Sequence, residues 1–377
     1  MLESTKLVDI PVIRAACQRT GLHPTVSFLA GDASDRKFYR LVCGDFSAIC
    51  MMFPKWEGGY GGDPLSWLGM QKALQEMEIP VPAILHVDEK ECCIWTEDFG
   101  DLFLNHELGK HALERSHPQF SHLLKLYQEA LDLLVKAQYP EHAQPSPANM
   151  RSFDTEKLMF EMHFFAEHFL HKFLELNVES SFFENVMADL KKLCTWLHAQ
   201  ERVLCHRDYH VRNIMIHDGH AKWIDFQDAR MGPHTYDVVS LVRDSYVKIS
   251  PDVRIELFQY YFQQTNVARQ KQNKQPLEWS AYSLEVERMA IQRNIKAIGS
   301  FGYLATSKQK PNYLAYVPFT VRSILEATPL DDKAAHGLEH DYPHLHSLLF
   351  SLRHGPLSER LSEKMHKRGI APFGVNS

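Results

Sequence analysis

The sequence lacks the long hydrophobic runs of a membrane protein and the cysteine spacings of a disulfide or zinc scaffold. No apolar run in its 377 residues approaches the roughly 18–20 residues that span a bilayer. Residues 1–6 have neither the basic start nor the apolar centre of a signal peptide. The seven cysteines are scattered, odd in number and never spaced C-x-x-C, which favours free thiols in a reducing compartment. We therefore expect a cytoplasmic protein that does not bind membranes.

The sequence also has no excess of basic residues. Lysine and arginine total 41 against 47 aspartates and glutamates, a formal charge of −6, so no general attraction to nucleic acid is expected. Apolar residues at 45% and charged residues at 23% are ordinary for a globular chain, which excludes a disordered or collagen-like protein. At roughly 150 residues per domain, the length predicts two domains or one large bilobal domain.

Short strands dominate the first quarter of the chain. A helical pattern over residues 7–17 precedes β-branched or aromatic runs at 26–28, 38–42, 46–53, 84–87 and 92–96. Trp67, Met70, Leu74 and Met77 share one face of a helix that Pro80 ends. These patterns predict a small, mostly antiparallel sheet with at least one helix.

Helical periodicity dominates from Asp101 almost to the end of the chain. It covers residues 120–136, 158–176, 182–197, 236–247, 253–262 and 284–298. The exception is 203–223, where extended segments flank a turn at Asp218-Gly219, while 144–147 and the tail after Gly355 have loop-like composition. We predict an α+β bilobal chain: an N-terminal lobe (1–97), a helical lobe (98–355) and a tail (356–377), with a ligand between the lobes.

Three polar residues in the strand-rich insertion carry the strongest chemical signal. Asp208 is followed five residues later by Asn213, and Asp225 stands twelve residues beyond. Phosphoryl transfer needs a carboxylate that orients the acceptor hydroxyl and oxygen ligands that hold Mg²⁺. Protein kinases place Asp and Asn at the same spacing in H-R-D-L-x-x-x-N, and here Asp-Phe-Gln stands in place of their Asp-Phe-Gly. The spacing indicates phosphoryl transfer.

Two plainer interpretations compete with this one. A lone Asp or Asn in such a loop commonly caps a turn or bonds its own backbone, although three together at this spacing favour function. Cys205, His206, Asp208 and His210 could also suggest zinc. The helical H-E-x-x-H pattern needs a Glu where Arg207 stands, so we expect His206 to brace the loop.

The chain resembles a known kinase superfamily over residues 30–300. The resemblance is carried by six segments: 31–40 (GDASDRKFYR), 97–101 (EDFGD), 206–213 (HRDYHVRN), 224–233 (IDFQDARMGP), 236–241 (YDVVSL) and 292–299 (QRNIKAIG). On these segments the chain resembles the aminoglycoside phosphotransferase and choline-kinase-like superfamily, which has the bilobal protein-kinase-like fold. More narrowly, it resembles the bacterial anomeric N-acetylmuramate/N-acetylglucosamine kinases of cell-wall recycling.

The resemblance implies roles for particular residues. Asp208 would be the catalytic base, Asn213 and Asp225 would hold Mg²⁺, and Asp237 would brace the catalytic loop. The turn that would cover the ATP phosphates consists of Asp32, Ala33, Ser34, Asp35 and Arg36. Backbone N–H groups and a small side chain can cradle phosphate there, although the turn can also be an ordinary polar hairpin. The hinge between the lobes would be 96–99, with Glu97 and Phe99 at the adenine.

The sequence departs from the usual kinase pattern at two points. Kinases of this fold place a Lys on the third strand to pair the phosphates, but here that strand has no basic residue. The candidates for this cation are Arg36, Lys37, Arg40 and Lys55. The second departure is the glycine-rich segment 58–62, which is either a lid over the cleft or a flexible loop.

The leading hypothesis is therefore an ATP- and Mg²⁺-dependent kinase that phosphorylates the anomeric hydroxyl of a small N-acetylated amino sugar, as a monomer or weak homo-oligomer. The first alternative is a related kinase acting on an aminoglycoside, choline or an amino alcohol, because the helical lobe has residues suited to cationic and to neutral acceptors. The second alternative is a non-catalytic nucleotide-binding pseudokinase, which the presence of Asp208, Asn213 and Asp225 disfavours.

Overall fold

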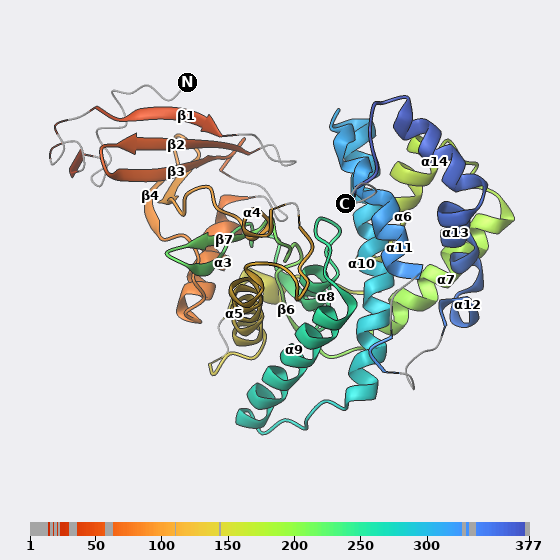
Figure 1. Cartoon of the computed structure of the whole chain (residues 1–377). Helices are drawn as coiled ribbons and strands as arrows, with labels where there is room; N and C mark the ends of the chain where they lie inside the picture. The colour runs from red at the N-terminus through yellow and green to blue at the C-terminus, as the bar shows by residue number, and fades with distance from the viewer. Residues whose placement is uncertain are drawn as a thin grey trace.

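The structure is a computed structural model in which an N-terminal sheet stands at one end of a mostly helical body (Figure 1). It describes residues 14–15, 18, 21, 23–29, 36–56, 63–109, 111–142, 145–325, 329–331 and 337–373. Most of the helix predicted at 7–17, the turn residues 32–35 and the segment 58–62 lie outside the described residues. The expectations for those segments stay predictions.

The N-terminal sheet is antiparallel throughout, with strand order β1-β2-β3-β5-β4. Its strands are β1 (Thr25–Leu29), β2 (Lys37–Cys43), β3 (Phe46–Met52), β4 (Ile84–Asp88) and β5 (Cys93–Glu97). Helix α3 (Pro64–Glu76) is inserted between β3 and β4, and the Asp63 side chain caps its first turn by accepting the backbone N–H of Ser66. All five strands lie where the sequence predicts them, to within two residues.

Alternation along the strands gives the sheet two different faces. On one face, Met51 and Ile94 join the main hydrophobic core together with Trp67 and Met70 of α3. On the other face, Cys50 and Trp95 belong to a small separate cluster that involves only residues of the sheet. The sheet is therefore attached to the helical body through one face and through α3.

The helical body contains four further strands close to its centre. These are β6 (Arg202–Cys205), β7 (Ile214–His217), β8 (His220–Trp223) and β9 (Arg230–Pro233). The helices before them are α4 (Leu104–Leu108), α5 (Phe120–Gln138), η1 (Pro147–Met150), α6 (Thr155–Phe165), the π-helical η2 (Ala166–Phe173) and α7 (Ser181–His198). The helices after them are α8 (Tyr236–Val242), α9 (Pro251–Lys271), α10 (Trp279–Ser307), η3 (Pro311–Tyr316), α11 (Val317–Leu325), α12 (Leu338–Asp341), α13 (Pro343–His354) and α14 (Pro356–His366).

The long helix α10 is the axis of this body (Figure 1), in contact with α6, η2, η3, α7, α8 and α11. Its glycines allow a close approach of backbones. A Cβ at Gly299 would lie 2.7 Å from the Cα of Phe165 at the end of α6, closer than real Cβ contacts, so a larger residue would push the two helices apart. The close contact between α10 and α6 at Gly299 therefore sets the position of Lys296, which lies one turn earlier on α10.

The structure corrects several sequence predictions. The tail is not loop-like after Gly355, because α14 begins at Pro356 and buries Leu361 and Met365, whose four-residue spacing puts them on one helical face. A 3₁₀ helix begins at Pro147, inside the predicted 144–147 loop. The helix predicted over 236–247 ends at Val242. The predicted α+β architecture is confirmed, while the domain limits at 97 and 355 stay predictions. No described helix is long and apolar enough to cross a membrane.

Candidate active site

Two antiparallel strand pairs bring the distant polar residues together. Strands β7 and β8 pair with Ile214 opposite Trp223, and β6 pairs with β9 with Cys205 opposite Arg230. The loop 206–213 leaves β6 and the segment 224–229 leaves β8, so both begin at the same end of these ladders. The backbone N–H of Ile224 donates to the carbonyl of Asn213 at 3.3 Å. The pairing therefore places Asp208, Asn213 and Asp225 side by side.

Asp208 lies in a strongly positive environment. Its Oδ1 accepts a hydrogen bond from Lys296 Nζ of α10 at 2.8 Å, and 29% of its side chain is exposed. Burial alone would raise the pKa of Asp208, but Lys296, Arg207 and His210 together hold that pKa well below its ordinary value. The carboxylate is therefore ionised at neutral pH and has an open side.

Asp225 and Asn213 form a compact set of oxygen donors beside Asp208. The Asn213 amide donates from Nδ2 to the Asp208 carbonyl at 2.9 Å and to Asp225 Oδ2 at 3.5 Å. Asp225 Oδ1 accepts bonds from Arg36 Nη2 and Gln227 Nε2, each at 3.0 Å. Carboxylate and amide oxygens are ligands that Mg²⁺ prefers, and the ion completes its shell with water and phosphate. Asp225 and Asn213 would hold such an ion with the Asn213 amide turned so that Oδ1 points toward Asp225.

A buried aspartate fixes the backbone of the catalytic loop. Asp237 of α8 accepts the backbone N–H of His206 at 2.6 Å and of Arg207 at 3.0 Å. Burial raises the pKa of Asp237 to about 7, although both N–H donors favour its charged form. Arg207 has φ of 79°, a left-handed backbone that costs free energy for a non-glycine residue. The Asp237 bonds hold Arg207 in that conformation and so orient the next residue, Asp208.

A second set of contacts fixes the far half of the loop. Asp244 accepts the backbone N–H of Val211 at 3.0 Å. The Arg212 guanidinium lies 3.7 Å from the ring centroid of Tyr246 and donates to the Tyr316 hydroxyl at 2.8 Å. Cation–π contacts of this kind stabilise a desolvated arginine, so Arg212 anchors the segment that leads to Asn213.

The loop also rests on buried aromatic rings. The predicted bracing role of His206 agrees with its geometry: its Nε2 lies 2.9 Å from the Ile224 carbonyl, and its ring packs on Tyr209 and Trp223. Trp223 Nε1 donates to the Tyr209 hydroxyl, which in turn donates to the Ala130 carbonyl of α5. The loop is thereby joined to α5.

The predicted nucleotide residues lie at three places. Residues 32–35 are outside the described part of the chain, while Arg36 is 5% exposed and contacts Asp225. Glu97 ends β5 and accepts the backbone N–H of Ala83 through Oε2 at 3.2 Å. Phe99 is buried and its ring centroid lies 5.3 Å from that of His217. Glu97 and Phe99 thus stand at the junction between sheet and helical body.

Two of the four candidate cations make charge contacts between the sheet and the helical body. Arg40 pairs with Asp98 at 2.7 Å and Asp101 at 2.8 Å, and donates to the Gly100 carbonyl at 2.8 Å. Its guanidinium is therefore committed to the segment just after β5. Arg36, by contrast, reaches the Asp225 carboxylate. Of the described candidates, Arg36 has the side chain nearest to the donor set.

Sequence reasoning assigned no role to several residues that complete the site. Lys296 lies in the segment 292–299 that carries the resemblance, but nothing in its local pattern ties it to Asp208. Glu161 of α6 is 4% exposed and binds Arg207 at 3.3 Å and Gln292 of α10 at 3.0 Å. The only local sign of a role for Glu161 is that a charged residue stands among the apolar residues of an amphipathic helix. The sequence around Asp244 gives no comparable sign of a role.

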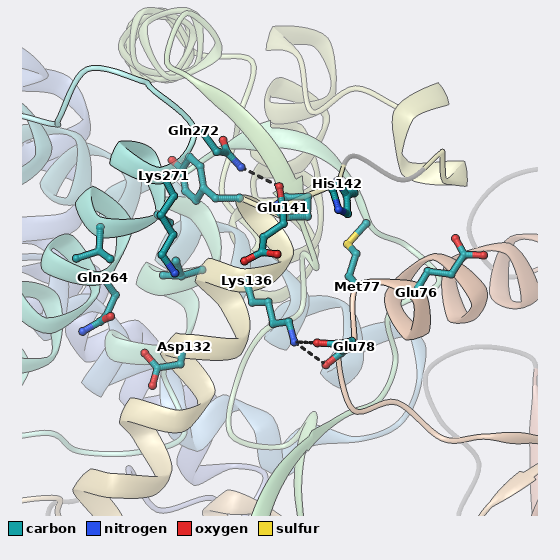
Figure 2. Close-up of a pocket in the computed structure, with 15 residues that line it drawn as sticks. Glu76, Met77, Glu78, Asp132, Lys136, Glu141, His142, Gln264, Lys271 and Gln272 are labelled. Atoms are coloured by element: carbon teal, nitrogen blue, oxygen red, sulfur yellow. Dashed lines mark hydrogen bonds and ion pairs between the residues drawn. The ribbon is translucent and has the colours of Figure 1, made fainter.

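A large cavity of the molecule lies away from this site. It has a volume of about 940 Å³ and lies between the end of α3, the end of α5 and the C-terminal part of α9. Figure 2 shows Lys136 paired with Glu78 there, at 2.6 Å. Asp208, Asn213 and Asp225 do not line it, so it has no direct part in chemistry at those residues.

Comparisons with known proteins agree with this geometry. A model of the phosphotransferase enzyme family matches residues 25–271. An N-acetylmuramate/N-acetylglucosamine kinase of Neisseria meningitidis serogroup B is 29% identical over 318 residues, covering 81% of this chain and 88% of that protein. The Pseudomonas aeruginosa protein of the same name is 30% identical over 295 residues, covering 77% and 79%. The crystal structure of ADP-bound aminoglycoside phosphotransferase APH(2'')-Ib has a TM-score of 0.51 at 13% identity, covering 83% of this chain and 96% of its own, which shows a shared fold.

Proposed function

The chain belongs to the phosphotransferase enzyme family, and from this premise we propose that it is an ATP- and Mg²⁺-dependent kinase of an N-acetylated amino sugar. The acceptor would be the anomeric hydroxyl of N-acetylmuramate or N-acetylglucosamine, the substrates named for both curated relatives. The observation that carries the proposal is the convergence of Asp208, Asn213 and Asp225 at one end of the paired strands. These three groups supply a base and two oxygen ligands.

In the proposed mechanism, Asp208 orients the sugar and receives its proton. The C1 hydroxyl of the sugar donates to the Asp208 carboxylate. The C1 oxygen then forms a bond to the γ-phosphorus of ATP as the bond from that phosphorus to the ADP oxygen breaks, and the hydroxyl proton passes to Asp208. Mg²⁺ bound by Asn213 and Asp225 would neutralise the charge on the phosphates. Arg36 adds a further positive charge at the same place.

The remaining predicted residues would hold the nucleotide. We propose that residues 32–36 cover the phosphates through backbone N–H groups and that the segment carrying Glu97 and Phe99 faces the adenine. The attachment of Arg40 to Asp98 and Asp101 supports a hinge here, because these pairs join strand β2 to the segment that leads into the helical body.

The product of the reaction tests the proposed function directly. We expect that incubation with ATP, Mg²⁺ and N-acetylmuramate yields a sugar phosphorylated on C1, seen as phosphorus coupling to C1 and its proton in the NMR spectrum. N-acetylglucosamine should give the corresponding product. Phosphate on another carbon would contradict the anomeric assignment. Turnover of choline or an aminoglycoside in place of both sugars would support the alternative acceptor class.

The ion pair between Lys296 and Asp208 predicts a shift in the pH dependence of the reaction. The base acts as a carboxylate, so activity is lost as pH falls through its pKa. Because Lys296 lowers that pKa, Lys296→Met should move the acid limb of kcat/KM upward by about 1–3 pH units. Lys296→Arg retains the charge and should leave the limb near its original position. A Lys296→Met profile that differs from the wild-type profile only in height would contradict this role.

A further inference from the structure

A group of basic residues lies around Arg207 of the candidate catalytic loop, together with the carboxylates of Glu161 and Asp228. The segment 151–153 runs beside β9: Phe153 N–H donates to the Met231 carbonyl at 2.9 Å, and Met231 N–H donates to the Arg151 carbonyl at 3.1 Å. Helix α6 begins directly afterwards at Thr155. This arrangement brings Lys157, in the first turn of α6, toward Arg230, which lies opposite Cys205 just before the catalytic loop.

The carboxylates of this group are committed to Arg207. Arg207 binds Glu161 at 3.3 Å and has Asp228 at 3.7 Å, while Arg151 donates to the Gln227 carbonyl and the Ser66 hydroxyl. Among the residues that the structure describes, no carboxylate lies within 4.0 Å of Lys157 Nζ or the Arg230 guanidinium. Lys157 lies over the Phe160 ring at 4.4 Å, and Arg230 Nε donates only to the Asp228 carbonyl, at 3.4 Å.

Neither cation is fully surrounded by water. Both side chains are partly buried. Burial, followed by the charge of Arg207, lowers the pKa of Lys157 and of Arg230, and Glu161 and Asp228, whose carboxylates lie more than 4.0 Å from both cations, offset this only in part. A partly desolvated cation without a counter-charge in direct contact is unfavourable, and an anion placed between two of them relieves that cost. Lysine and arginine also retain several N–H donors for such an anion.

The position of Asp228 indicates which anion this is. Asp228 is close enough to Asp208, Asp225, Arg207 and Arg230 for all four to influence its pKa, which burial raises. Asp228 is therefore close both to the catalytic acids and to Arg230. A nucleotide phosphate beside these cations carries several negative charges and would be repelled by Asp228 more strongly than a single carboxylate would. A single acidic substituent on the acceptor, held some distance from the reacting hydroxyl, meets less repulsion.

We propose that Lys157 and Arg230 form a carboxylate-binding subsite for the acceptor sugar, close to Asp228. The inference rests on the proposed function and specifies its substrate class. N-acetylmuramate is N-acetylglucosamine with a lactyl ether that ends in a carboxylate, so the two sugars differ by the group this subsite recognises. The same surplus of positive charge disfavours a cationic acceptor such as choline.

Paired kinetics with the two sugars test this subsite. For Lys157→Met and Arg230→Met, kcat/KM for N-acetylmuramate should fall about 10- to 100-fold, the range for losing a charged hydrogen bond. The value for N-acetylglucosamine and the KM for ATP should change less than about twofold. Lys157→Arg should retain most of the preference. Lys191→Met, at an exposed position on α7, is the matched control and should change neither sugar.

The methyl ester of N-acetylmuramate gives a second, independent measurement, because it keeps the lactyl group and removes only its charge. The wild-type enzyme should prefer the acid to the ester by about the factor that the variants lose, and the variants should no longer distinguish them. Equal losses for both sugars, or a raised KM for ATP, would overturn the subsite. If the wild-type enzyme phosphorylates neither sugar, the proposed function itself fails, and the subsite with it.

Discussion

Asp208→Ala is expected to lower kcat by about 10²- to 10⁴-fold, the usual contribution of a positioned general base. The Asp208 side chain contacts Lys296, but it is Asn213 and Asp225 that provide the proposed metal ligands. Nucleotide affinity should therefore stay close to that of the wild-type enzyme. Single-turnover rates with N-acetylmuramate and equilibrium binding of ATP separate the two quantities.

The matched control for Asp208 is Asp218, in the turn between β7 and β8. Its side chain is 87% exposed and pairs with His217. Asp208→Asn keeps the size of the side chain and removes the base, so its loss should be similar to that of Asp208→Ala, while Asp218→Asn should have wild-type kcat. An Asp208→Ala enzyme with near wild-type kcat would remove the base assignment.

Asp225→Asn is expected to raise the Mg²⁺ concentration for half-maximal rate by at least about tenfold. Even residues that only support metal ligands commonly change metal affinity by 10- to 100-fold, and Asp225 is the one charged member of the proposed ligand pair. We also expect a lower kcat, because a more weakly held Mg²⁺ would neutralise the negative charge of the phosphates less well. Magnesium titrations at fixed ATP give both values.

The choice of asparagine follows from the backbone at this position. Asp225 has φ of 61°, in the left-handed region that Asn and Asp tolerate better than other non-glycine residues. Alanine would add backbone strain to the loss of the ligand. Asp218 has a similar φ of 52°, so Asp218→Asn makes the same change in the same conformation away from the site. Titrations of Asp225→Asn that superimpose on those of the wild-type enzyme would contradict the metal role.

Much of the architecture could be predicted from local patterns. Strand alternation, helical periodicity and turn residues placed the five-stranded sheet, α3, α5 and the strand-rich insertion near their observed positions, because these signals depend only on neighbouring residues. The likeness to phosphotransferases was carried by short segments and is confirmed by the family match. The tail prediction was wrong because Leu361 and Met365 need a partner surface, supplied by the packing of α14 on α13.

The sequence by itself determined the spacing from Asp208 to Asn213 and their position beside two short strands, because those residues are joined through a few covalent bonds. Only the tertiary structure decided which cations meet the acids. Lys296 reaches Asp208 across 88 residues of chain, and Arg36 reaches Asp225 across 189. The approach of α10 to α6 and the seating of the sheet on the helical body create these contacts. Packing over the whole molecule sets both, and no local pattern of residues encodes them.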